Sequence, residues 1–202
     1  MINNSEKIKS MLSFEDKDDF YFLQILKRRK DNPDMERDMV VIDNFYIDSF
    51  ETYDKKIPNV IALCIMENAR AYFRLNKRNY AKLGPHMLKR VVDIVFTENC
   101  KALRSAFDSV TGEFHSDPNK TWVVDVDNDK NVVFDDLCST LIQLQKDAHT
   151  ESYIIPREPM MVNIPTKNGL HIITRPFNLQ KFKEKFPTID VHKDNPAILY
   201  CP

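Results

Sequence analysis

The sequence predicts an α+β fold in which helices cover sheets of mixed or antiparallel strands. Short runs rich in aromatic and β-branched residues, separated by turn residues, indicate strands. Two longer stretches repeat apolar residues at three- and four-residue steps, as helices do. The sequence has only three glycines and contains neither a GxGxxG turn nor a GxxxxGK[ST] loop, which excludes Rossmann and P-loop phosphate sites. The 202 residues fit one domain, or two small units that share a core.

The N-terminal half begins with a predicted antiparallel strand pair. Residues 20–29 and 39–47 are rich in aromatic and β-branched side chains, and the turn signal Asn32-Pro33-Asp34 lies between them. Residues 58–68 could form a short helix or a strand. Residues 70–76 alternate polar and apolar side chains well enough to predict a strand.

Helices are expected to complete this half. Over residues 79–98 apolar side chains recur at helical spacing, and Pro85 inside the stretch either kinks the helix or marks its start. A second helix is expected over residues 99–109. Residues 1–115 are therefore predicted to form an N-terminal α/β module of a single domain.

The remaining residues, 116–202, predict a strand–helix–strand–strand–helix–strand order. Residues 121–127 read as a strand and residues 134–148 as an amphipathic helix. The other elements are two strands around a Lys-Asn-Gly turn within 160–174, a helix over 178–186 with Asn178 as its N-cap, and a final strand within 188–200.

Charge and cysteine usage narrow the class of protein. The formal net charge of −1 argues against binding nucleic acid through bulk charge, but it leaves room for a local basic groove. The four cysteines are scattered without a CxxC pair, as reduced cytoplasmic thiols are. Because the sequence shows neither a signal-peptide pattern nor 18 consecutive apolar residues, we expect a cytoplasmic protein with no membrane partner.

The string Val123-Val124-Asp125-Val126-Asp127 is the first candidate site. Alternate side chains of a strand project to the same side, so the carboxyl groups of Asp125 and Asp127 should lie roughly 6–7 Å apart on one face. Neighbouring carboxylates repel each other, and a hard divalent cation neutralises them. The pair predicts a Mg²⁺ or Mn²⁺ site, although a strand that runs into a polar turn would carry the same string.

A second candidate site is the string Thr166-Lys167-Asn168-Gly169-Leu170-His171. Gly169 would let the backbone approach a ligand closely, and Lys167 and His171 offer cationic or donor groups to a phosphate. Arg175 lies four residues beyond, on the same face of a regular strand. The predicted phosphate-binding residues are Thr166, Lys167, Gly169, His171 and Arg175. A plain hairpin with a partly exposed histidine is the alternative.

A third carboxylate lies between apolar residues in Ile189-Asp190-Val191, and Asp194 competes with Asp190 for the same role. Together the three strings resemble the three-motif catalytic core of the archaeo-eukaryotic primase superfamily, which includes phage primase–polymerases. Val124-Asp125-Val126-Asp127 matches the first motif, the string from Thr166 to His171 is similar to the second, and Ile189-Asp190-Val191 is the candidate third.

The resemblance implies a catalytic set and its ligands. Asp125, Asp127 and Asp190 would hold two divalent ions, and His171 would contact the phosphates of an incoming nucleoside triphosphate. Residues 116–202 would form the RRM-like catalytic module of this family. A single-stranded nucleic acid would serve as template, and a replication helicase is a candidate partner.

Two basic clusters could bind nucleic acid. One is Lys27-Arg28-Arg29-Lys30, and a looser one contains Arg74, Lys77 and Arg78 among aromatic residues. Arginine and aromatic side chains together can follow a phosphate backbone and stack on bases, so we predict that Arg74, Lys77 and Arg78 bind nucleic acid. Solvated strand ends and a charged helix face would produce the same pattern.

Three functions agree with these observations. The first is a metal-dependent nucleotidyltransferase of the primase–polymerase type, acting on nucleoside triphosphates and a nucleic-acid template. The second is a metal-dependent nuclease or other phosphodiesterase built on the same side chains. The third is a non-catalytic, phage-type accessory protein that binds nucleic acid.

Overall fold

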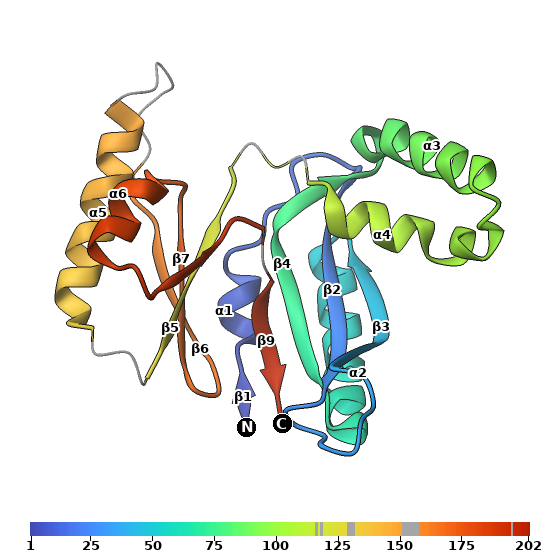
Figure 1. Ribbon diagram of the computed structural model, residues 1–202, viewed down its shortest axis with the longest axis horizontal. Helices are drawn as coiled ribbons and strands as arrows, with labels where there is room; N and C mark the ends of the chain where they lie inside the picture. The colour runs from blue at the N-terminus through green and yellow to red at the C-terminus, as the bar shows by residue number, and fades with distance from the viewer. Residues whose placement is uncertain (116, 118, 129–131, 151–157, 195) are drawn as a thin grey trace.

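The computed structural model describes residues 1–202 except 116, 118, 129–131, 151–157 and 195. The described residues form two antiparallel sheets that lie side by side, with helices packed against them (Figure 1). The predicted α+β class is therefore confirmed.

The first sheet has the strand order β1-β9-β4-β2-β3. Its strands are β1 (Ile2–Asn3), β9 (Ala197–Cys201), β4 (Arg70–Asn79), β2 (Asp19–Arg28) and β3 (Met39–Ile47). The predicted strand pair is β2 and β3, which are antiparallel as expected. Helices α1 (Ser5–Lys9) and α2 (Phe50–Glu67) pack against this sheet through buried apolar side chains.

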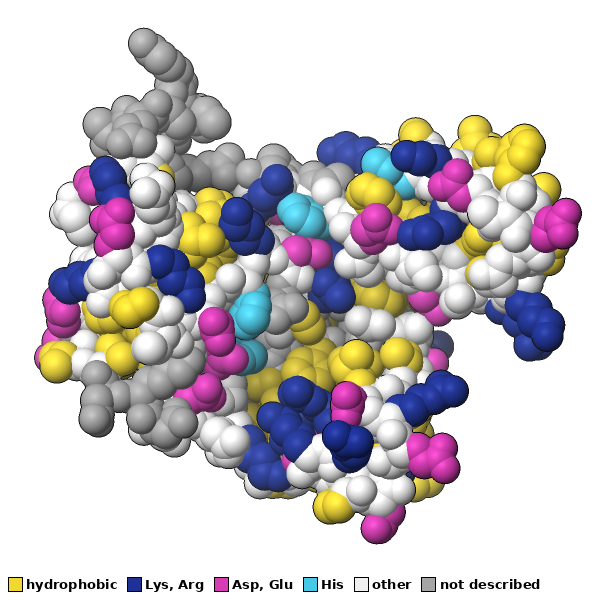
Figure 2. Space-filling view, viewed as in Figure 1, with side chains coloured by type: hydrophobic (Ala, Val, Ile, Leu, Met, Phe, Trp, Pro, Cys, Tyr) yellow, Lys and Arg dark blue, Asp and Glu magenta, His cyan; other side chains and the backbone are white. Residues whose placement is uncertain are grey.

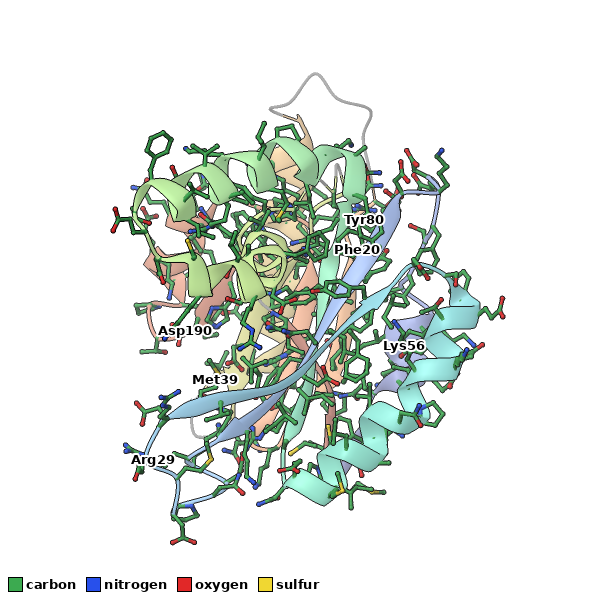
Figure 3. The ribbon with its side chains drawn as sticks, turned by 90° about the vertical axis from the view of Figure 1, so that its right-hand side faces the viewer. Phe20, Arg29, Met39, Lys56, Tyr80 and Asp190 are labelled. Carbon is green, nitrogen blue, oxygen red and sulfur yellow. The ribbon has the colours of Figure 1, made fainter. Side chains whose placement is uncertain are left out.

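Residues 58–68, which the sequence left open between helix and strand, belong to α2 except for the last residue. The helix begins eight residues earlier because Ser49 caps it, its hydroxyl oxygen accepting a hydrogen bond from the Thr52 backbone N–H. Beyond β4, α3 (Tyr80–Phe96), the 3₁₀ helix η1 (Cys100–Ser105) and α4 (Ala106–Glu113) extend from one end of the sheet (Figure 1). Phe20 of β2 stacks on Tyr80 at this junction (Figure 3).

The second sheet has the order β6-β7-β5-β8. Its strands are β5 (Trp122–Asp127), β6 (Met161–Pro165), β7 (Gly169–Thr174) and β8 (Asp190–His192). Helices α5 (Phe134–Thr150) and α6 (Leu179–Lys185) cover its outer face, and Asn178 caps α6 by accepting a hydrogen bond from the Lys181 N–H. The predicted strand–helix–strand–strand–helix–strand order is confirmed, with the first strand at the centre of the sheet.

The final predicted strand, 188–200, is wrong as a single element. It divides into β8, which pairs with β5 in the second sheet, and β9, which lies between β1 and β4 in the first. All five residues of β9 are buried, as expected of an apolar run in the interior of a sheet. The chain thus returns to its N-terminal half, and the two predicted modules share a sheet.

Side chains of β5 alternate between two cores. Val123 packs towards the first sheet, in a cluster that also contains Ile173 and Ile198. Val124 packs towards α5 and α6 with Ile172. The odd-numbered residues of β5 therefore face the space between the sheets. No helix in the described part of the chain combines the length and apolar character that crossing a membrane requires.

Candidate active site between the two sheets

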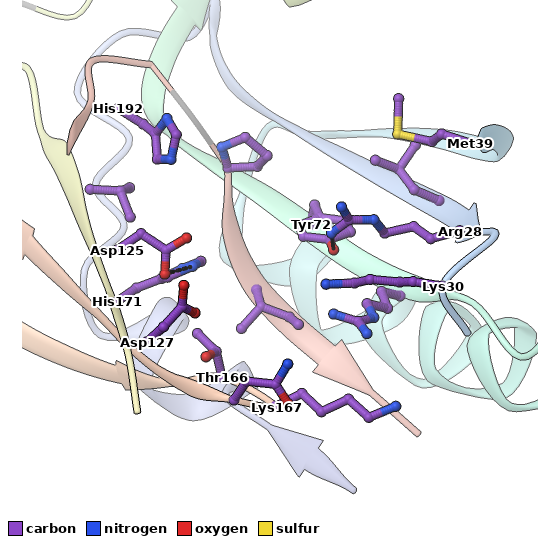
Figure 4. A pocket seen from close by; sticks show the side chains of 16 residues that line it. Arg28, Lys30, Met39, Tyr72, Asp125, Asp127, Thr166, Lys167, His171 and His192 are labelled. Atoms are coloured by element: carbon purple, nitrogen blue, oxygen red, sulfur yellow. Dashed lines mark hydrogen bonds and ion pairs between the residues drawn. The ribbon is translucent and has the colours of Figure 1, made fainter. Parts of the chain in front are cut away.

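A cavity of about 380 Å³ lies between the two sheets. Strands β5 and β7 and the residues around β8 supply one wall, and the ends of β2, β4 and β9 supply the other (Figure 4). In Figure 2, histidine and acidic side chains border a hollow between the two halves of the molecule, and Lys and Arg side chains gather across from them. The polar side chains that line the cavity are Arg28, Lys30, Arg70, Tyr72, Asp125, Asp127, Thr166, Lys167, Asn168, His171 and His192.

Strand register brings the first two sequence motifs together on the acidic wall. Asp125 pairs with His171 across β5 and β7, and Asp127 pairs with Gly169. Directly opposed residues of antiparallel strands project from the same face, so both carboxylates and the imidazole point into the cavity. The Nε2 atom of His171 lies 3.5 Å from Oδ1 of Asp125.

The surroundings of His171 disfavour its charged form. Burial lowers its pKa from the ordinary value, even though the nearby Asp125 carboxylate acts in the opposite direction. Its Nδ1 atom is buried and has no hydrogen-bond partner among the described residues. A buried polar atom without a partner is uncommon, and here it belongs to a histidine that lines the cavity.

Gly169 lies at a point of close contact between two strands. A β-carbon at this position would lie 2.9 Å from both the Asp127 Cα and the Val126 carbonyl carbon, and closer still to the Val126 oxygen. The glycine is thus needed for the close approach of β5 to β7. It fixes the position of Asp127 indirectly.

The opposite wall is rich in cations. Arg28 donates a hydrogen bond from Nη1 to the Tyr72 hydroxyl oxygen, at 3.1 Å, and Lys30 lies beside it (Figure 4). Burial, together with the charges of Arg70 and Arg28, lowers the pKa of Lys30. Cations that crowd one another in this way gain free energy when an anion binds between them.

Asp31 links the two sheets at the edge of this cavity. Its carboxylate accepts hydrogen bonds from Nε and Nη2 of Arg70, at 2.7 and 2.6 Å, and from Nζ of Lys167, at 3.0 Å. Burial opposes the charge of this carboxylate, but the hydrogen bonds from Arg70 and Lys167 leave the pKa of Asp31 below its ordinary value. Lys167 and Thr166, two of the predicted phosphate-binding residues, lie on the cavity wall, and Lys167 is tied to the hairpin of the first sheet.

Three other predicted groups lie elsewhere. Asp190 pairs with Asp125 in the β5–β8 register, but its side chain is 65% exposed, lies 3.8 Å from Lys183 and does not line the cavity. Asp194 accepts a hydrogen bond from Nη2 of Arg78 at 2.8 Å, in a buried network away from the cavity. Arg175 donates from Nε to the Glu158 carbonyl oxygen outside the cavity.

Arg74, Lys77 and Arg78 do not form the predicted nucleic-acid surface. They belong to β4, the middle strand of the first sheet, where Lys77 and Arg78 are buried and Arg74 is partly buried. Arg78 is fully buried, and Nζ of Lys77 donates to Asp19 at 3.1 Å. These cations are engaged in ion pairs within the fold.

The cationic wall that the structure reveals comes instead from Arg28 and Lys30, with Arg70 from the start of β4. The signal was visible in the sequence, because Lys27-Arg28-Arg29-Lys30 runs directly into the turn at Asn32-Pro33-Asp34, and hairpin turns are exposed.

The donor set on the acidic wall suits a hard divalent cation only in part. Among the described residues, no group of three or more His, Cys, Asp and Glu side chains is arranged to hold a metal ion. Asp125 and Asp127 are nevertheless the kind of set that Mg²⁺ uses with a phosphate substrate, since this ion typically takes one or two carboxylates and completes its shell with water and phosphate oxygens. The Nε2 atom of His171, 3.5 Å from Oδ1 of Asp125, lies beside this pair.

Comparison with known proteins returned no match, whether against family models, curated proteins or solved structures.

Proposed function

We propose that this chain is a metal-dependent nucleotidyltransferase of the primase–polymerase type, which adds nucleoside triphosphates to a nucleic-acid strand. The observation that supports it most is the pairing of opposite charges across one cavity, with Asp125 and Asp127 on one wall and Arg28 and Lys30 on the other. A triphosphate bound with a divalent cation carries both signs of charge, so it can neutralise both walls at once.

Each of these side chains would have a separate role in such a reaction. A hydroxyl oxygen of the growing strand attacks the α-phosphorus of the triphosphate, and pyrophosphate leaves. Mg²⁺ or Mn²⁺ at Asp125 and Asp127 would neutralise negative charge on the phosphates. Arg28 and Lys30 bind the phosphates from the opposite wall, and His171 donates a hydrogen bond to a phosphate oxygen.

The third carboxylate of the set is assigned to Asp190 rather than to Asp194. Its backbone position opposite Asp125 brings it within one strand spacing, and its side chain forms an exposed ion pair with Lys183. Asp194 is engaged with Arg78 and Arg74, so releasing it would leave a buried guanidinium without its partner.

A phosphodiesterase is the alternative that a specific contact favours. The imidazole of His171, whose pKa is lowered by burial, lies near Asp125, an arrangement that can take a proton from a water molecule attacking a phosphodiester. Such an enzyme would cleave nucleic acid without any triphosphate.

Titration calorimetry tests the proposal. The wild-type chain is expected to bind a nucleoside triphosphate only when Mn²⁺ or Mg²⁺ is present, and Asp125→Asn and Asp127→Asn are expected to abolish this binding while the folded state survives. The matched control is Asp93→Asn, which removes an exposed carboxylate from α3.

An assay with a labelled oligonucleotide then separates the functions. Metal-dependent extension that requires triphosphates supports the transferase, whereas degradation without triphosphate identifies the phosphodiesterase. If the oligonucleotide binds but is neither extended nor degraded, and the triphosphate does not bind, the chain is a non-catalytic accessory protein.

A further inference from the structure

The cavity between the sheets continues outward over the hairpin that joins β2 to β3. A second, more open hollow of about 500 Å³ is lined by Arg28, Arg29, Lys30, Pro33 and Asp38, and it shares Arg28 and Lys30 with the first. The two hollows are therefore neighbouring parts of one surface.

The charge of this outer hollow is unbalanced. Three consecutive cations, Arg28 to Lys30, line it against a single described carboxylate, Asp38. Asp38 pairs with Arg29 at 2.9 Å, but their side chains are 85% and 55% exposed, so the pair contributes little free energy and opens readily. Arg29 is thus available to another anion, and its position on the hairpin (Figure 3) lets that anion approach from solvent.

We propose that the outer hollow is a second binding subsite, which holds the phosphate backbone of the single-stranded nucleic acid that enters the cavity. The inference rests on the proposed function for the identity of the polymer, because a transferase needs a strand next to its nucleotide. A strand that extends from the cavity meets Arg28 and Lys30 first and Arg29 next. With a volume of about 500 Å³, the hollow has room for a short segment of one strand.

The subsite predicts opposite effects for two substitutions, because Arg29 binds the phosphate and Asp38 competes with the phosphate for Arg29. Arg29→Gln removes a phosphate contact, so the dissociation constant for a single-stranded oligonucleotide should rise about threefold. The slope of log affinity against log salt should also fall in magnitude by about 0.7, the value for one contact with a single strand. Asp38→Asn releases Arg29 and should tighten binding by a similar factor.

Two residues of the same hairpin provide matched controls. Arg37→Gln and Asp34→Asn make the same changes in net charge, but Arg37 and Asp34 are exposed and line neither hollow. Fluorescence anisotropy with a labelled oligonucleotide, in EDTA and without triphosphate, measures all four variants. The expected result is a clear change for Arg29 and Asp38 and a much smaller one for the controls.

Equal effects at Arg29 and Arg37, or no effect of Asp38→Asn, would overturn the subsite, since bulk charge would then explain the binding. A preference of the wild-type chain for duplex over single strand would overturn it as well. The outcome is independent of the metal-dependent triphosphate titration, because EDTA removes the ion. A failed triphosphate titration would therefore count against the transferase alone, and a failed anisotropy experiment would count against the subsite alone.

Discussion

Gly169 provides the sharpest test of how the site is built, because the chain has only three glycines and each is in a different environment. In Gly169→Ala, the new β-carbon would contact Asp127 Cα and the Val126 carbonyl carbon at 2.9 Å, whereas ordinary contacts begin at 3.4 Å. The contacting atoms are backbone, so β7 and β5 must separate at this end by more than the half ångström that these two contacts require, because the Val126 oxygen lies closer still. The substitution thus acts directly on the strand that carries both carboxylates.

The expected cost follows from the contacts on either side. The Asn128 N–H donates to the Asn168 carbonyl oxygen at 2.8 Å, and the Thr166 N–H donates to the Gly169 carbonyl oxygen at 2.9 Å. Separation of the strands stretches the first beyond the usual 3.2 Å and disturbs the second. Overpacking of about 1–3 kcal/mol plus about 1 kcal/mol for a weakened hydrogen bond gives a destabilisation of about 3 kcal/mol. The melting temperature should fall by about 6–12 °C.

Calorimetric or circular-dichroism melting measures the effect, and the other two glycines are the controls. Nothing lies within 4 Å of a β-carbon at Gly84 in α3, and the nearest atom to one at Gly112 in α4 is Phe22 Cε1, at 4.0 Å. Both alanine variants should gain about 0.5–1 kcal/mol from helix propensity. If Gly169→Ala melts at or above the wild-type temperature, the close approach of β5 to β7 is wrong.

The remaining predictions concern the two walls of the cavity. His171→Ala should raise the KM for the triphosphate about tenfold with a smaller change in kcat, since a hydrogen bond to a charged group contributes about 1.5 kcal/mol; steady-state kinetics with an unchanged KM would remove His171 from the phosphate site. Asp31→Asn should cost about 3 kcal/mol at neutral pH because it leaves Arg70 buried without its partner. Because the pKa of Asp31 is lower in the folded than in the unfolded chain, the wild-type advantage is complete above the ordinary carboxyl pKa and disappears as the pH falls through the folded value. Urea denaturation of the wild type and of Asp31→Asn at a series of pH values measures this difference in free energy of unfolding. A difference that does not change with pH would contradict the prediction.

The spacing of apolar residues along the sequence predicted most of the strands and helices, because tertiary packing did not change the local preference of those segments. The bounds of β3 coincide with the predicted 39–47, and the alternation of β5 placed Asp125 and Asp127 on the shared face where the structure has them. The single strand expected within 188–200 was wrong because alternation identifies a strand but not its sheet. An uninterrupted apolar run such as Ala197–Cys201 indicates a strand covered on both faces, and this signal separates it from the three residues of β8.

The basic residues were misassigned for a different reason. A cation in a strand looks the same in sequence whether it faces solvent or a buried carboxylate, and only tertiary structure supplies the partner. Lys77 meets Asp19, which is 58 residues away, and Arg78 meets Asp194, which is 116 residues away. Lys30, by contrast, follows the end of its strand and stays at the cavity, so position relative to a turn was a better guide than composition.

The backbone of Asp190 lies where a third metal ligand is expected, but its carboxylate does not. The antiparallel pairing fixes its Cα opposite Asp125, and no rotation of its side chain changes that. Its carboxylate, in contrast, is held by one exposed ion pair with Lys183 at 3.8 Å, which contributes at most about 1 kcal/mol. A divalent cation at Asp125 would attract a neighbouring carboxylate by more than this, because the attraction scales with the product of the charges. A three-carboxylate site therefore requires a change of rotamer at Asp190, whereas recruiting Asp194 would require breaking a buried network, and the backbone as folded already favours the first.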